Sequence, residues 1–86
     1  RDAMDRVRQH LEEFHAHLLE NGYSPAASKN YRFRASTFLK RHQEALDAGE
    51  AEARAIVEGY ISELPRNTAS TIPAAAVRRW WSFRFR

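Results

Sequence analysis

The chain has 86 residues, 43% of them hydrophobic and 12% aromatic, and a formal net charge of +3. This length and composition indicate one small folded domain, residues 1–86, and exclude both a disordered chain and a core combined with a deep catalytic cleft. The absence of cysteine excludes disulfides and cysteine-based metal or redox sites, and no apolar run approaches the ~20 residues that cross a bilayer.

The charge alternates along the chain. The balance of Lys and Arg over Asp and Glu is −2 for residues 1–22, +4 for 23–45, −4 for 46–64 and +5 for 65–86. If the second and fourth segments lie side by side, they form a basic face, which favours a polyanionic partner. The chain starts at Arg1 and shows no helix-ending signal at its last residues, so we expect it to be a piece of a longer protein.

Residues 3–21 are predicted to form an amphipathic helix that faces the core. Gly22 ends it well, because glycine adopts the left-handed conformation without a Cβ penalty. Ser24 can cap the next helix, and Pro25 fits its first turn, where no N–H donor is needed. The apolar stripe of the first helix consists of Met4, Val7, Leu11, Phe14 and Leu18, with Leu19 widening it.

Residues 25–43 are predicted to form a second helix that is basic on its outer side. Its core face carries Ala27, Tyr31, Ala35, Phe38 and His42, with Leu39 at the edge. Its outer face carries Lys29, Arg32, Ser36 and Lys40, and also Phe33. An outward phenylalanine among cations is unusual, although one exposed apolar side chain is common in soluble proteins.

A connection with its break at Gly49 is expected before a third helix at residues 51–64, which Pro65 ends. The third helix is acidic outside and is interpreted as scaffold. Its core face carries Ala53, Ile56, Val57, Tyr60 and Leu64, with Ile61 beside it.

A polar turn at residues 65–70 leads to a fourth helix, which Ser70 or Thr71 can cap and which has Pro73 near its start. The first apolar stripe of this helix is Ile72, Ala76, Trp80 and Phe83, and the second is Val77, Trp81 and Phe85. Either this helix is central to the bundle, or its second stripe docks something outside the chain. Four helices with short connections predict an all-α orthogonal four-helix bundle.

The sequence holds little that suggests catalysis. His10 and His17 share a helix face but lie two turns apart, roughly 10 Å, which is too far to share a metal ion, and His15 points to another side. No nucleophile motif or Gly-rich phosphate loop is present. We therefore expect no metal, no cofactor and no complete active site.

The spacing of the motifs resembles the N-terminal core-binding domain of tyrosine recombinases, the phage-integrase family. That domain usually has a helix, then Gly-x-Ser-x-x-Thr-x-x-x-Tyr, then Phe seven residues later. Here Ala27 replaces the usual Thr, so the phosphate contact of that hydroxyl is not expected. The positions that carry the resemblance are Leu11, Phe14, Gly22, Ser24, Pro25, Tyr31, Phe38 and Leu39, and in the last helix Ser70, Thr71, Ala76, Arg79, Trp80 and Phe83.

The resemblance implies a SAM-like bundle that clamps one side of double-stranded DNA through its second and fourth helices. The catalytic Arg, His and Tyr of such a recombinase would lie in a following domain, so no residue here is assigned a catalytic role. The implied partners are DNA, the catalytic domain of the same chain and other recombinase protomers, without a membrane, in a prokaryotic cytoplasm at the nucleoid.

Under this interpretation twelve residues are predicted to contact DNA, through phosphates above all. They are Ser24, Lys29, Asn30, Arg32, Ser36, Lys40, Arg66, Thr68, Ser70, Thr71, Arg78 and Arg79. The alternative for the cations is ordinary solubilising charge, and Ser24, Ser70 and Thr71 are interpreted first as helix caps. The alternative function is a helical protein-interaction module that uses the surface of Trp81 and Phe85.

Overall fold

The computed structural model describes the backbone of residues 2–65 and 71–86, and all of its regular structure is helical. The prediction of an all-α protein with four α-helices is confirmed, and no strand occurs among the described residues. The elements are α1 (Asp2–Glu20), α2 (Pro25–Arg41), the short 3₁₀ helix η1 (Gln43–Leu46), α3 (Glu50–Ser62) and α4 (Thr71–Arg84).

The turn between α1 and α2 has the predicted conformation. Gly22 has a φ of 89°, in the left-handed region that favours glycine. Ser24 is the N-cap of α2, and its hydroxyl oxygen accepts a hydrogen bond from the backbone N–H of Ala27 at 3.1 Å. Pro25 is the first residue of the helix. This local chemistry reverses the chain and lays α2 against α1.

The connection between α2 and α3 is more ordered than the sequence suggested. Part of it forms η1, whose Ala45 and Leu46 are buried in the core. Gly49 is the N-cap of α3, in an extended conformation, as its predicted role as a break implies. The last residue of α3 is Ser62, three positions before Pro65, so the helix ends slightly earlier than predicted.

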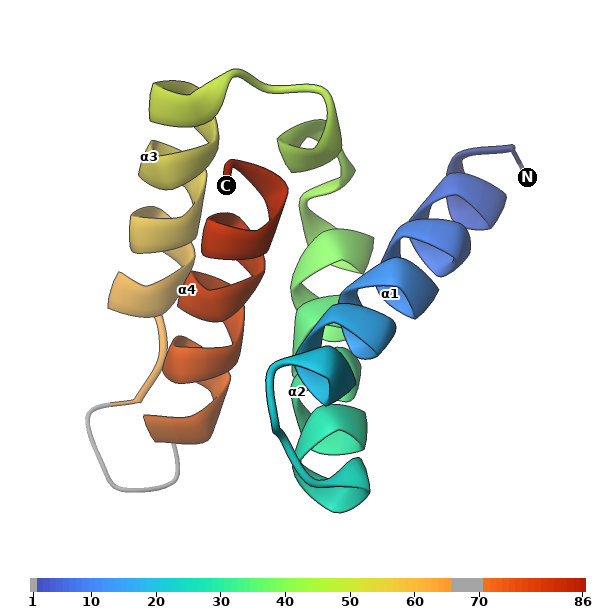
Figure 1. The fold of residues 1–86 in the computed structure, drawn as a ribbon. Helices are drawn as coiled ribbons and strands as arrows, with labels where there is room; N and C mark the ends of the chain where they lie inside the picture. Colours follow the sequence, from blue (N-terminus) through green and yellow to red (C-terminus); the bar gives the residue numbers. More distant parts are fainter. Residues whose placement is uncertain (1, 66–70) are drawn as a thin grey trace.

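Helix α2 lies between α1 and α4, and α3 packs on the other side of α4 (Figure 1). The two segments that the charge count marks as basic are therefore neighbours in space. Their contact is aromatic at its centre, where the rings of Phe38 and Trp80 lie 5.6 Å apart. Thr71 is the first helical residue of α4, and Ser70, the other predicted cap, lies outside the described residues.

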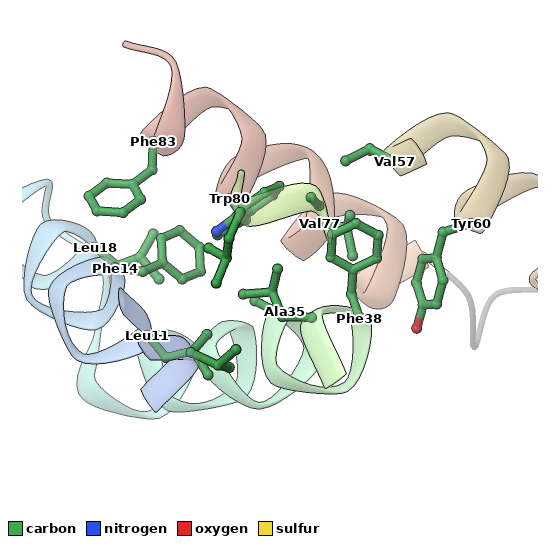
Figure 2. Packing of buried hydrophobic residues seen from close by; sticks show 14 residues of the cluster. Leu11, Phe14, Leu18, Ala35, Phe38, Val57, Tyr60, Val77, Trp80 and Phe83 are labelled. Atoms are coloured by element: carbon green, nitrogen blue, oxygen red, sulfur yellow. The ribbon is translucent and has the colours of Figure 1, made fainter. Parts of the chain in front are cut away.

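All four α-helices contribute to one apolar cluster, which Figure 2 shows around Trp80. Trp80, Phe14 and Phe38 are its largest fully buried side chains. The cluster consists of Val7, Leu11, Phe14, Leu18, Ala35, Phe38, Leu39, Ala45, Leu46, Val57, Tyr60, Val77, Trp80 and Phe83, and the partly buried Tyr31 packs against it.

Three predicted core positions are wrong. Met4, Leu19 and Ile72 keep 37%, 42% and 44% of their surfaces exposed. Met4 lies close to the N-terminal end of α1, and Leu19 is turned ~100° from the buried Leu18. The buried stripe of α4 is likewise rotated from the predicted one and is made of Pro73, Ala76, Val77, Trp80 and Phe83.

Candidate nucleic-acid interface

The two adjacent helices α2 and α4 contain no carboxylate side chain, whereas α1 and α3 each contain several. Among the 17 residues of α2 there are five cations, and α4 carries three arginines in 14 residues. Because α2 is acid-free along its whole length, its outer side can approach a polyanion without repulsion from its own residues.

A groove of about 330 Å³ lies between α1 and α2 and gathers four of the predicted site residues. These four are Lys29, Arg32, Ser36 and Lys40, all from the outer face of α2. We call it the α1–α2 groove, and it is lined by Met4, Val7, Arg8, Leu11, Lys29, Arg32, Phe33, Ser36 and Lys40. The groove thus has an apolar floor and a cationic rim.

The cations of this rim differ in how free they are. Lys29 and Lys40, the only lysines of the chain, are exposed and have no ion-pair partner among the described residues. The Arg32 guanidinium donates a hydrogen bond to the carboxylate of Glu12, an ion pair that links α2 to α1. The lysines therefore offer the most available positive charge, and Arg32 offers less.

The other predicted residues that the structure describes do not line the groove. Asn30 is half-buried on α2, and the Ser24 oxygen serves as the helix cap. Thr71 is exposed at the start of α4. Arg66, Thr68 and Ser70 lie outside the described residues.

The two predicted site arginines of α4 lie next to different neighbours. The Arg78 guanidinium lies 3.5 Å from the carboxylate of Glu58 on α3. The Arg79 guanidinium lies 5.8 Å from the ring centre of Tyr23, at the turn between α1 and α2. The structure therefore does not bring Arg78 to the α1–α2 groove, and Arg79 is held by an aromatic ring.

Sequence reasoning missed Arg8, which α1 contributes to the groove beside Phe33. The sequence pattern indicates only a core-facing helix with a solvated back for the first helix and assigns it no site residue. Arg8 is four residues after Met4 and three before Leu11, so the sequence spacing could have predicted that it lies next to the apolar stripe. Which side of that stripe meets α2 follows only from the packing of the two helices.

His10 links α1 to α4 through a hydrogen bond. The Trp80 indole N–H donates to its Nε2 at 2.7 Å, and burial lowers the pKa of His10 below its ordinary value. Within the described part of the chain, no three His, Asp or Glu side chains are grouped to hold a metal ion.

Trp81 and Phe85 form a smaller, half-buried surface beside α3. The Trp81 indole N–H donates to the backbone carbonyl of Glu50 at 3.1 Å, and the Arg54 guanidinium lies 5.3 Å from the Trp81 ring centre. The rings of Trp81 and Phe85 are 5.7 Å apart. Trp81 is thus anchored inside the domain, while part of its surface remains open.

No protein-family description, no curated protein and no solved structure matches this chain. Among the described residues, no helix is both long and apolar enough to cross a membrane.

Proposed function

We propose that this chain is the DNA-binding module of a site-specific tyrosine recombinase or integrase, with a SAM-like orthogonal bundle that clamps one side of duplex DNA. The observation that carries the proposal is the position of Lys29 and Lys40, which lie on a carboxylate-free helix at the rim of one groove and have no ion-pair partner in the described part of the chain. The resemblance of the Gly22-x-Ser24-Pro25 turn to the core-binding domain supports the same function.

In this function the domain binds and positions DNA, and the reaction belongs to a catalytic domain of the same chain. Lys29 and Lys40 contact phosphates and release counterions, so the affinity decreases steeply with salt. Arg79 and the start of α4 contact the backbone beside α2. Other protomers bind neighbouring half-sites of the same DNA, in the cytoplasm of a prokaryote.

The test is an NMR titration of the 86-residue chain with a short DNA duplex at low and moderate salt. Shifts on α2 and on residues 71–79 that weaken as salt increases are the expected result. Lys29→Gln should weaken binding, whereas Arg54→Gln, which makes the same charge change on α3, should have little effect. Equal effects of both variants, or shifts confined to α1 and α3, would contradict the proposal.

The second candidate function is protein interaction through Trp81 and Phe85. It is favoured by the partial exposure of both rings and by a hollow of about 190 Å³ next to Trp81 on the α3–α4 side. Binding at this surface would depend on apolar burial, so it would change little with salt. The salt series of the titration therefore separates the two functions.

A further inference from the structure

Phe33 is the most exposed of the large apolar side chains, with 60% of its surface accessible. It lines the α1–α2 groove together with the two lysines and Arg32, and the Arg34 guanidinium lies 5.6 Å from its ring centre. Solubility does not explain a phenylalanine at this exposed position among cations, because a polar residue would make the surface more soluble. Its position next to the cations favours a partner that carries negative charge and also has an apolar group close to that charge.

The spacing of the two lysines along α2 indicates which part of a DNA duplex Phe33 would contact. Lys29 and Lys40 are eleven positions apart, which corresponds to roughly 16 Å of helix at ~1.5 Å per residue. The major groove of DNA is about 12 Å wide and has a row of phosphates on each side. When the two lysines bind phosphates, Phe33, which lies between them, faces the base edges.

Among the base edges in the major groove, the C5-methyl group of thymine is the apolar feature, and phenylalanine is one of the side chains that contact it. We propose that Phe33 reads thymine methyl groups and gives α2 a preference for A·T base pairs. This inference rests on the proposed function, because it requires α2 to lie in the major groove.

The test compares an alternating A·T duplex of 16 base pairs with the same duplex carrying uracil in place of thymine. An alternating duplex presents methyl groups in every register, so the target sequence need not be known. Affinity is measured by fluorescence anisotropy at low salt. One buried methyl group corresponds to about a fourfold preference for the thymine duplex. Phe33→Ala should lose the part of this preference that comes from the methyl contact.

Leu19→Ala is the matched control, because Leu19 is also exposed and apolar but lies on α1 outside the groove. It should keep the preference. Any change that uracil makes in DNA shape acts equally on the wild type and on Phe33→Ala, so only the difference between them reports the methyl contact. Circular dichroism verifies that Phe33→Ala is folded, as its exposure predicts.

Two results would overturn the inference, and only the second would also overturn the proposed function. Salt-sensitive binding without a thymine preference, or with a preference that Phe33→Ala retains, would reject the role of Phe33 and leave the proposed function intact. Absence of salt-sensitive binding to any duplex would reject both.

Discussion

Trp80 and Trp81 are adjacent in the sequence but serve different neighbours of α4. Trp80 is fully buried, donates its N–H to His10 of α1 and packs on Phe38 of α2. Trp81 donates its N–H to Glu50 at the start of α3. Successive helical residues point ~100° apart, so the pair links α4 to the other three helices. Of the two roles that the sequence allowed for this helix, the central one describes its packing.

The contact between His10 and Trp80 predicts a pH dependence of stability. Burial lowers the pKa of His10 in the folded state, whereas in the unfolded chain the pKa is near its ordinary ~6.5. Neutral His10 accepts the Trp80 hydrogen bond, and a protonated ring cannot accept it. The contribution to stability is therefore complete above about pH 6.5 and is lost as the pH falls through the folded-state pKa. Urea unfolding at pH 7.5 and 5.5, followed by tryptophan fluorescence, should show the decrease.

His10→Gln is the control for this effect, because the amide oxygen of glutamine also accepts a hydrogen bond but does not titrate. The difference between the two pH values should shrink in this variant. The Arg6 guanidinium lowers the pKa of Asp47, so that pair loses its contribution only at more acidic pH, below the ~4 of an unfolded aspartate. An unchanged pH difference in His10→Gln would contradict the role of His10.

At the scale of elements, two glycines allow a matched test of how backbone conformation determines where a helix ends and continues. A Cβ at Gly22 or at Gly59 would meet no atom within 4 Å apart from its chain neighbours and, at Gly59, the backbone of its own helix, so neither site is crowded by the rest of the fold. Gly22 has a positive φ, and Gly22→Ala should lower the free energy of unfolding by about 1 kcal/mol. Gly59 lies inside α3, and Gly59→Ala should raise it by about 0.5–1 kcal/mol. Urea unfolding measures both changes, and two changes of the same sign would contradict this account.

The sequence could predict the local conformation of the elements, but not how the helices pack on one another. The turn at Gly22 and the cap at Ser24 depend on residues within one helical turn, so their conformations followed from local chemistry. The pair of Arg32 with Glu12 and the place of Arg8 in the groove depend on how α1 lies on α2. Amphipathic periodicity predicts that a helix is buried on one side but not which neighbour it meets. The rotated stripe of α4 at Ile72 has the same origin.

At the scale of the whole molecule, acidic helices flank a carboxylate-free pair. Two ion pairs lie along the borders, Arg32 with Glu12 between α2 and α1, and Arg78 with Glu58 between α4 and α3. Exposed pairs of this kind contribute only ~0–1 kcal/mol to stability. Their larger effect is on charge, because each pair offsets one positive charge at a border, whereas Lys29 and Lys40 have no ion-pair partner among the described residues.

This arrangement predicts that removing a negative charge improves DNA binding. Glu12→Gln frees the Arg32 guanidinium at the rim of the α1–α2 groove. The released cation should strengthen binding to a DNA duplex by about two- to fivefold, the scale of one exposed charge contact. It should also steepen the salt dependence, because one more phosphate is neutralised. Glu20→Gln makes the same charge change at the far end of α1 and should leave the salt slope unaltered. If both variants raise affinity equally, net charge alone is responsible, and Arg32 has no specific part in the interface.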